Sequence, residues 1–152
     1  MLGLKGITKK VSNLNQMENL YHIRERFSII HDNKKIGIQM KWEGKREKPP
    51  MLMLPALSTI SRSDEWQHFK AIVTDKYQLI TIDWPGFGES DKIDIHYSGT
   101  VLQETLKKAI KVIQSKNNRK LTIIAAGHSA SVVLTLKDKY INKIKQIVLI
   151  AP

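Results

Sequence analysis

The sequence contains no cysteine, and this absence removes several kinds of chemistry at once. A disulfide framework, a thiolate nucleophile and a zinc or iron–sulfur site with Cys ligands are all excluded. The absence also fits a reducing compartment, so we expect a soluble protein of the cytoplasm or of an organelle stroma or matrix. No apolar run approaches the ~20 residues of a membrane-spanning helix, so we expect no membrane span.

Acidic residues are also scarce: 14 Asp and Glu stand against 25 Lys and Arg, for a net charge of +11. Such an excess can indicate a nucleic acid, an anionic membrane or an acidic partner. Most of the cations are lysines that are scattered along the chain, and no run reaches the length of a basic arm. We therefore expect solvated lysine faces and no nucleic-acid partner, and keep a basic nucleic-acid or membrane-surface module as an alternative.

What the chain does have is the composition of a globular protein. Its 152 residues are 41% hydrophobic and 26% charged, which fits about one domain with a real core. No acid precedes Glu18, so we expect residues 1–24 to be a flexible or targeting-like segment. Residues 25–152 then form the folded part.

Apolar and β-branched residues cluster into short runs that predict six strands. The first two runs, residues 27–30 and 36–42, flank a polar turn and predict a hairpin or a pair of adjacent antiparallel strands. The other runs predict strands at residues 51–54, 78–82, 121–126 and 144–150.

Helical periodicity between these strands predicts three helices. The first helix follows a cap at Ser61 or Ser63, and its apolar stripe consists of Trp66, Phe69, Ile72 and Val73. The second helix begins near Ser98 or Thr100 and ends at about residue 117. The third helix covers residues 130–140. Alternating strands and helices predict the α/β class, with a mostly parallel sheet and helices on both faces.

Loops that follow the carboxyl ends of inner strands are where open α/β sheets place their sites. Residues 127–131 read Gly-His-Ser-Ala-Ser between a predicted strand and a predicted helix, which matches G-x-S-x-G except that Ser131 replaces the last Gly. In such an elbow Ser129 is the nucleophile, and its Oγ must stand clear above the sheet. The alternative is a serine that caps a helix in a tight turn.

The loop at residues 54–59 follows another inner strand and could supply backbone donors to an oxyanion hole. The two N–H groups would come from Leu57 and from Ala130, the residue after Ser129. Pro55 has no N–H and cannot donate. A simple strand-ending turn is the alternative.

The loop at residues 83–90 contains Gly86 and Gly88 but lacks the third Gly of a dinucleotide fingerprint. Its Pro85 and two glycines specify a fixed turn. We expect Asp83 to brace this turn rather than to act as a catalytic acid.

Together these motifs resemble the α/β-hydrolase fold family over roughly residues 27–152. The loop at 83–90 is similar to the family's D-x-P-G-x-G-x-S turn, residues 127–129 resemble its elbow, and residues 55–59 with 83–85 resemble a subgroup found in photosynthetic lineages. The resemblance implies a hydrolase that attacks an ester, thioester or amide of a small-molecule acyl substrate. Ser129 would be the nucleophile, with no metal and no cofactor.

The same resemblance assigns structural roles at the site to the remaining motif residues, which are Gly127, His128, Ser131, Asp83, Pro85, Gly86 and Gly88. His128 adjoins the nucleophile in sequence and is not expected to be the catalytic base.

The acid and the histidine of a catalytic triad cannot be identified. In this fold they follow the nucleophile in the order acid, then His. After Ser129 the chain has one acid, Asp138, and none of its five histidines. His96 is the only histidine that could lie near the carboxyl ends of the strands, and a surrogate base at His96 is kept as a minor alternative only.

About six of the family's eight strands are predicted, which indicates a truncated α/β-hydrolase fold. Three hypotheses remain: part of a serine hydrolase that is inactive as this chain, a non-catalytic binding protein of the same fold, and the basic module. The last strand would leave an open sheet edge, so we also expect self-association through it.

Overall fold

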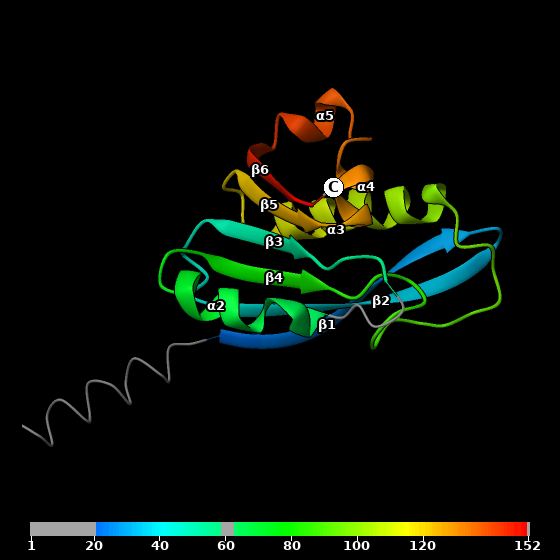
Figure 1. The fold of residues 1–152 in the computed structure, drawn as a ribbon, viewed down its shortest axis with the longest axis horizontal. Helices are drawn as coiled ribbons and strands as arrows, with labels where there is room; N and C mark the ends of the chain where they lie inside the picture. The colour runs from blue at the N-terminus through cyan, green and yellow to red at the C-terminus, as the bar shows by residue number, and fades with distance from the viewer. Residues whose placement is uncertain (1–20, 59–62, 152) are drawn as a thin grey trace, which may run out of the picture.

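The computed structural model describes residues 21–58 and 63–151, which form one sheet with flanking helices (Figure 1). The strands are β1 (Tyr21–His31), β2 (Lys34–Gly44), β3 (Pro50–Leu54), β4 (Gln78–Ile82), β5 (Leu121–Ala126) and β6 (Ile144–Ile150). The helical elements are the 3-10 turn η1 (Ser63–Trp66), α2 (Gln67–Val73), α3 (Gly99–Lys116), α4 (His128–Val133) and α5 (Asp138–Ile141).

The six strands are arranged in the order β1-β2-β4-β3-β5-β6. The β1–β2 and β2–β4 pairs are antiparallel, and the pairs β4–β3, β3–β5 and β5–β6 are parallel. The carboxyl ends of β3, β4 and β5 therefore meet at one edge of the sheet. The predicted α/β class, with a mostly parallel six-stranded sheet, is confirmed.

The predicted hairpin is present, and its turn consists of Asp32 and Asn33, both with positive φ. Two such residues suit the tight turn between twisted antiparallel strands. At the end of the hairpin that is remote from this turn, the pairing of β1 with β2 extends to Tyr21 and Gly44. The expected domain boundary after residue 24 is therefore wrong, because residues 21–24 belong to β1. Residues 1–20 lie outside the described part of the chain.

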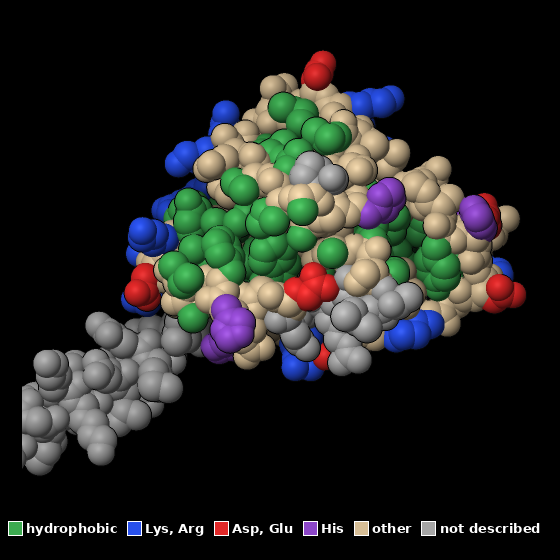
Figure 2. All heavy atoms as spheres, in the orientation of Figure 1, with side chains coloured by type: hydrophobic (Ala, Val, Ile, Leu, Met, Phe, Trp, Pro, Cys, Tyr) green, Lys and Arg blue, Asp and Glu red, His purple; other side chains and the backbone are tan. Residues whose placement is uncertain are grey.

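Side chains alternate between two buried layers on the two faces of the sheet. Leu52 and Leu54 of β3 belong to a large core that includes α3, whereas Met51 and Met53 of the same strand pack in a smaller cluster with Trp66. Figure 2 shows hydrophobic side chains gathered over the strands on the face that carries α2. This alternation confirms helices on both faces.

Helix α3 matches its prediction closely. It follows Ser98, and its apolar residues Leu102, Leu106, Ala109, Ile110 and Ile113 are all buried. The stripe predicted for the preceding helix is only partly correct. Trp66 is buried but lies in η1, and Ile72 points outward with 76% of its surface exposed.

The single helix expected at residues 130–140 is wrong, because two short helices, α4 and α5, occupy this region. The Thr135 N–H and Oγ1 both bond the carbonyl of Val132, and the Leu136 N–H bonds that of Val133. These tight i→i−3 bonds end α4, since Thr competes with the helical ladder through its own side chain.

Strand β6 lies at one edge of the sheet and pairs, within the described residues, with β5 alone. Self-association through this edge stays a prediction. Across residues 21–58 and 63–151, no helix is both long and apolar enough to cross a membrane.

Candidate functional site

Three loops converge at the carboxyl ends of β4, β3 and β5, and one residue from each takes part in a buried hydrogen-bonded junction. The indole Nε1–H of Trp84 lies 2.9 Å from the Oγ of Ser129 and 3.2 Å from the carbonyl oxygen of Pro55. The Oγ–H of Ser129 in turn donates to the Pro55 carbonyl. All three residues are buried, so the junction lies beneath the surface of the site.

The turn between β5 and α4 consists of Gly127 alone, with φ 52° and ψ −134°. Residues with a side chain rarely adopt this conformation, because their Cβ collides with the backbone. The Gly127 N–H donates to the carbonyl of Ile150 over 2.9 Å, which ties the turn to the end of β6. Gly127 is therefore the sharp turn of this strand–turn–helix unit, in a conformation that would be strained for any residue with a Cβ.

Ser129 is the second residue of α4, and its side chain is fully buried. The expectation that its Oγ stands clear above the sheet is wrong. The physical reason is its position: two residues after the turn, the helix directs the side chain down toward Pro55 and Trp84. The Oγ is both a donor and an acceptor in that buried junction.

The expected oxyanion-hole donors differ in their surroundings. The Ala130 N–H donates to the carbonyl of Gly127 over 3.0 Å, and its role as an oxyanion donor stays a prediction. Leu57 lies half-buried in the loop after β3 and packs against the large core. Its role as a donor stays a prediction.

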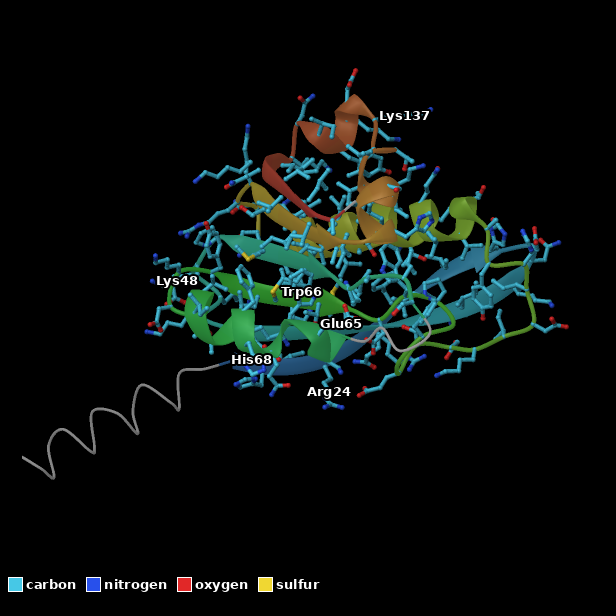
Figure 3. The ribbon with its side chains drawn as sticks, viewed as in Figure 1. Arg24, Lys48, Glu65, Trp66, His68 and Lys137 are labelled. Carbon is cyan, nitrogen blue, oxygen red and sulfur yellow. The ribbon has the colours of Figure 1, made fainter. Side chains whose placement is uncertain are left out.

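The sequence pattern does not indicate Glu65 as a site residue, yet its carboxylate reaches the loop after β3. Its Oε2 accepts a hydrogen bond from the N–H of Ala56 over 3.1 Å. Figure 3 shows Glu65 at the beginning of the α2 region, beside the carboxyl ends of the central strands. The only signal in the sequence was an acid near the expected helix start, and this does not indicate a contact with the loop after β3.

The loop at residues 83–90 is a braced turn. The buried carboxylate of Asp83 accepts the N–H of Glu89 over 3.0 Å, and the Ser90 hydroxyl donates to the Asp83 carbonyl over 2.6 Å. Gly86 and Gly88 both have positive φ. These contacts hold the turn together, and the expected role of Asp83 as a brace rather than a catalytic acid stays a prediction.

The other polar residues named from the sequence are not gathered at this junction. His96, His128, Ser131 and Asp138 are all exposed, and Asp138 begins α5. Within the described residues, no group of three or more His, Asp or Glu side chains could hold a metal ion.

Comparisons of the sequence with known proteins find no match, whereas the comparison of structures does. No protein-family model matches the sequence. No curated protein matches it either.

Solved structures are similar to this chain in fold. A 2-hydroxy-6-oxo-6-phenylhexa-2,4-dienoate hydrolase from Rhodococcus sp. strain RHA1 is 15% identical over 86% of this chain and 46% of its own, with a TM-score of 0.68. A thioesterase domain from the curacin biosynthetic pathway is 18% identical over 84% and 46%, with a TM-score of 0.67. A haloalkane dehalogenase from Agrobacterium tumefaciens C58 is 18% identical over 85% and 41%, with a TM-score of 0.68.

These three proteins share the α/β-hydrolase fold, and the chain described here has the same fold. It spans less than half the length of each of them. The resemblance that the motifs indicate is thereby confirmed at the level of the fold, and the six-stranded sheet corresponds to part of that fold.

Proposed function

We propose that this chain is part of a protein that binds a small molecule with an acyl group at the carboxyl ends of β3, β4 and β5, and that Ser129 does not act as a nucleophile. Open α/β sheets bind their ligands at this edge. Among the similar structures are a thioesterase domain and a 2-hydroxy-6-oxo-6-phenylhexa-2,4-dienoate hydrolase. The proposed function is thus the binding of a ligand, without covalent catalysis by Ser129.

The observation that carries this proposal is that the Ser129 hydroxyl is both a donor and an acceptor in a buried junction. A nucleophilic serine must transfer its proton to a base and must reach the carbonyl carbon of a substrate. The Ser129 proton is donated to the Pro55 carbonyl, and the Trp84 N–H occupies a lone pair of the oxygen. Since the residue is also fully buried, a substrate carbonyl has no direct approach to it.

Hydrolysis of an ester, thioester or amide through an acyl-Ser129 intermediate is the competing function. A fluorophosphonate probe separates the two, because it reacts covalently with activated serine nucleophiles. We expect no Ser129-dependent labelling of the folded protein, with a known serine hydrolase treated in parallel as the positive control. Labelling that disappears in Ser129→Ala but persists in Ser131→Ala would overturn the proposal.

The binding half of the proposal needs its own measurement. Carboxylates from acetate to decanoate can serve as stable probes of an acyl-binding site. A compound that binds the native state alone raises the midpoint of thermal unfolding. We expect an increase with at least one chain length, and the absence of any change across the series, up to millimolar concentrations, counts against an acyl-binding site.

A further inference from the structure

We infer that Gly127, and not Ser129, lies where this fold presents its reactive side chain, so that the nucleophile position of this chain carries no side chain. The inference deepens the proposed function and rests on it, because it explains why the chain would bind an acyl compound without forming a covalent bond to it.

The backbone supplies the first step. The nucleophile of an α/β-hydrolase sits on a sharp, strained turn that joins a strand directly to a helix. Here β5 ends at Ala126 and α4 begins at His128, so a single residue makes that turn. Gly127 has the strained dihedral angles, φ 52° and ψ −134°, whereas Ser129 already lies inside the helix.

The direction of a side chain at this turn supplies the second step. A Cβ placed on Gly127 would lie 3.2 Å from the Cβ of Ala56, in the loop after β3. The N–H of Ala56 is bonded to a carboxylate oxygen of Glu65. A side chain at position 127 would therefore face the loop after β3, whereas Ser129 faces the buried Trp84.

The sequence around the turn agrees with this assignment. Strand and helix approach closely at an elbow, so the residues two positions before and after the nucleophile must be small. Centred on Gly127, these positions are Ala125 and Ser129, and both are fully buried. The G-x-S-x-G pattern read from the sequence is thus shifted by two residues from the elbow that the backbone forms.

The consequence concerns chemistry. Without a hydroxyl or thiol at position 127, no acyl-enzyme can form at the elbow, and an acyl ligand there remains reversibly bound. The missing side chain also lets a ligand approach the backbone of Gly127 more closely than a Ser would.

Because the chain has no cysteine, single-Cys variants provide a direct test. Gly127→Cys places a thiol at the proposed position, and Ser129→Cys is the matched control two residues away. We expect iodoacetamide to alkylate the thiol at position 127 at least about tenfold faster than the thiol at position 129, because buried thiols are inert. The two rates must become equal in guanidinium chloride.

The dihedral angles of Gly127 disfavour any residue with a Cβ, so a second variant covers the case in which Gly127→Cys does not fold. Ala56→Cys places a thiol on the facing loop, where φ is not positive. Fast alkylation there relative to Ser129→Cys supports an open site between the two loops. A thiol at position 129 that reacts as fast as those at 127 or 56 overturns the inference, whereas fluorophosphonate labelling of native Ser129 overturns the proposed function.

Discussion

The indole of Trp84 and the hydroxyl of Ser129 are joined by a buried hydrogen bond of 2.9 Å, which connects the loop after β4 to helix α4. The carbonyl of Pro55, directly after β3, accepts from both residues. Three segments that are distant in sequence are thus held at the carboxyl ends of adjacent strands. The hydroxyl of Ser129 contributes to the fold, which accounts for its burial.

Replacing Ser129 by Ala removes one donor and one acceptor from this junction. Trp84 keeps its bond to the Pro55 carbonyl, so neither of these two groups is left without a partner. We expect a loss of about 1–2 kcal/mol in the free energy of unfolding, as is typical for such hydrogen bonds. Urea denaturation measures this loss, and Ser131→Ala, at an exposed position of the same helix, should change stability by less than about 0.5 kcal/mol.

The energetic link between the two residues can be isolated by a double-mutant cycle. Trp84→Phe removes the N–H but retains an aromatic ring in the core, and Ser129→Ala removes the acceptor. We expect the effects to be non-additive, with a coupling energy of about 0.5–3 kcal/mol for residues in one hydrogen-bonded network. Additive effects within error would contradict the junction, and the pair Trp84→Phe with Ser131→Ala should be additive.

The fold could be predicted from the sequence where the relevant signal is local. The apolar periodicity of α3 identified its buried residues, and the run at Leu121–Ala126 marked β5 with its correct end. The turn of Asp32 and Asn33 likewise indicated the hairpin. In each case, the side-chain pattern and the backbone preference favour the same structure.

The site was predicted less well because its geometry depends on contacts between segments. The G-x-S part of the motif assigns the elbow to Ser129. The predicted strand, however, ends at Ala126, which leaves Gly127 as the turn residue. The contact of Glu65 with the Ala56 N–H depends on how η1 docks against the loop after β3. No sequence periodicity reports that docking.

The turn after β4, which contacts of Asp83 hold together, predicts that replacing Gly88 by any residue with a Cβ strongly destabilises the fold. This residue has φ 50°, and an added Cβ would lie 2.4 Å from the carboxyl carbon of Asp83. We expect Gly88→Ala to cost about 2–4 kcal/mol, since backbone strain and overpacking each contribute roughly 1–3 kcal/mol. Thermal unfolding would show a fall of about 4–16 °C at roughly 2–4 °C per kcal/mol for a chain of this size.

Gly99 is the matched control for this substitution. It begins α3, and an added Cβ would meet nothing within 4 Å. Gly99→Ala should leave stability unchanged or raise it by up to about 1 kcal/mol, because alanine restricts the unfolded chain. Equal effects at the two glycines would mean that the Asp83 carboxylate does not occupy the space beside Gly88.

The same substitution in two helices tests which apolar side chains form the core. Ile110 of α3 is fully buried, whereas Ile72 of α2 is 76% exposed. We expect Ile110→Ala to cost about 2–5 kcal/mol, the usual range for a large-to-small change in a core. Ile72→Ala should change stability by less than about 0.5 kcal/mol, as at other surface positions. Urea denaturation of both variants measures the two losses in the free energy of unfolding. A loss at Ile72 close to that at Ile110 would show that the Ile72 side chain is packed in solution. That result would agree with the apolar stripe predicted from the sequence and would contradict the exposed position of Ile72 on α2.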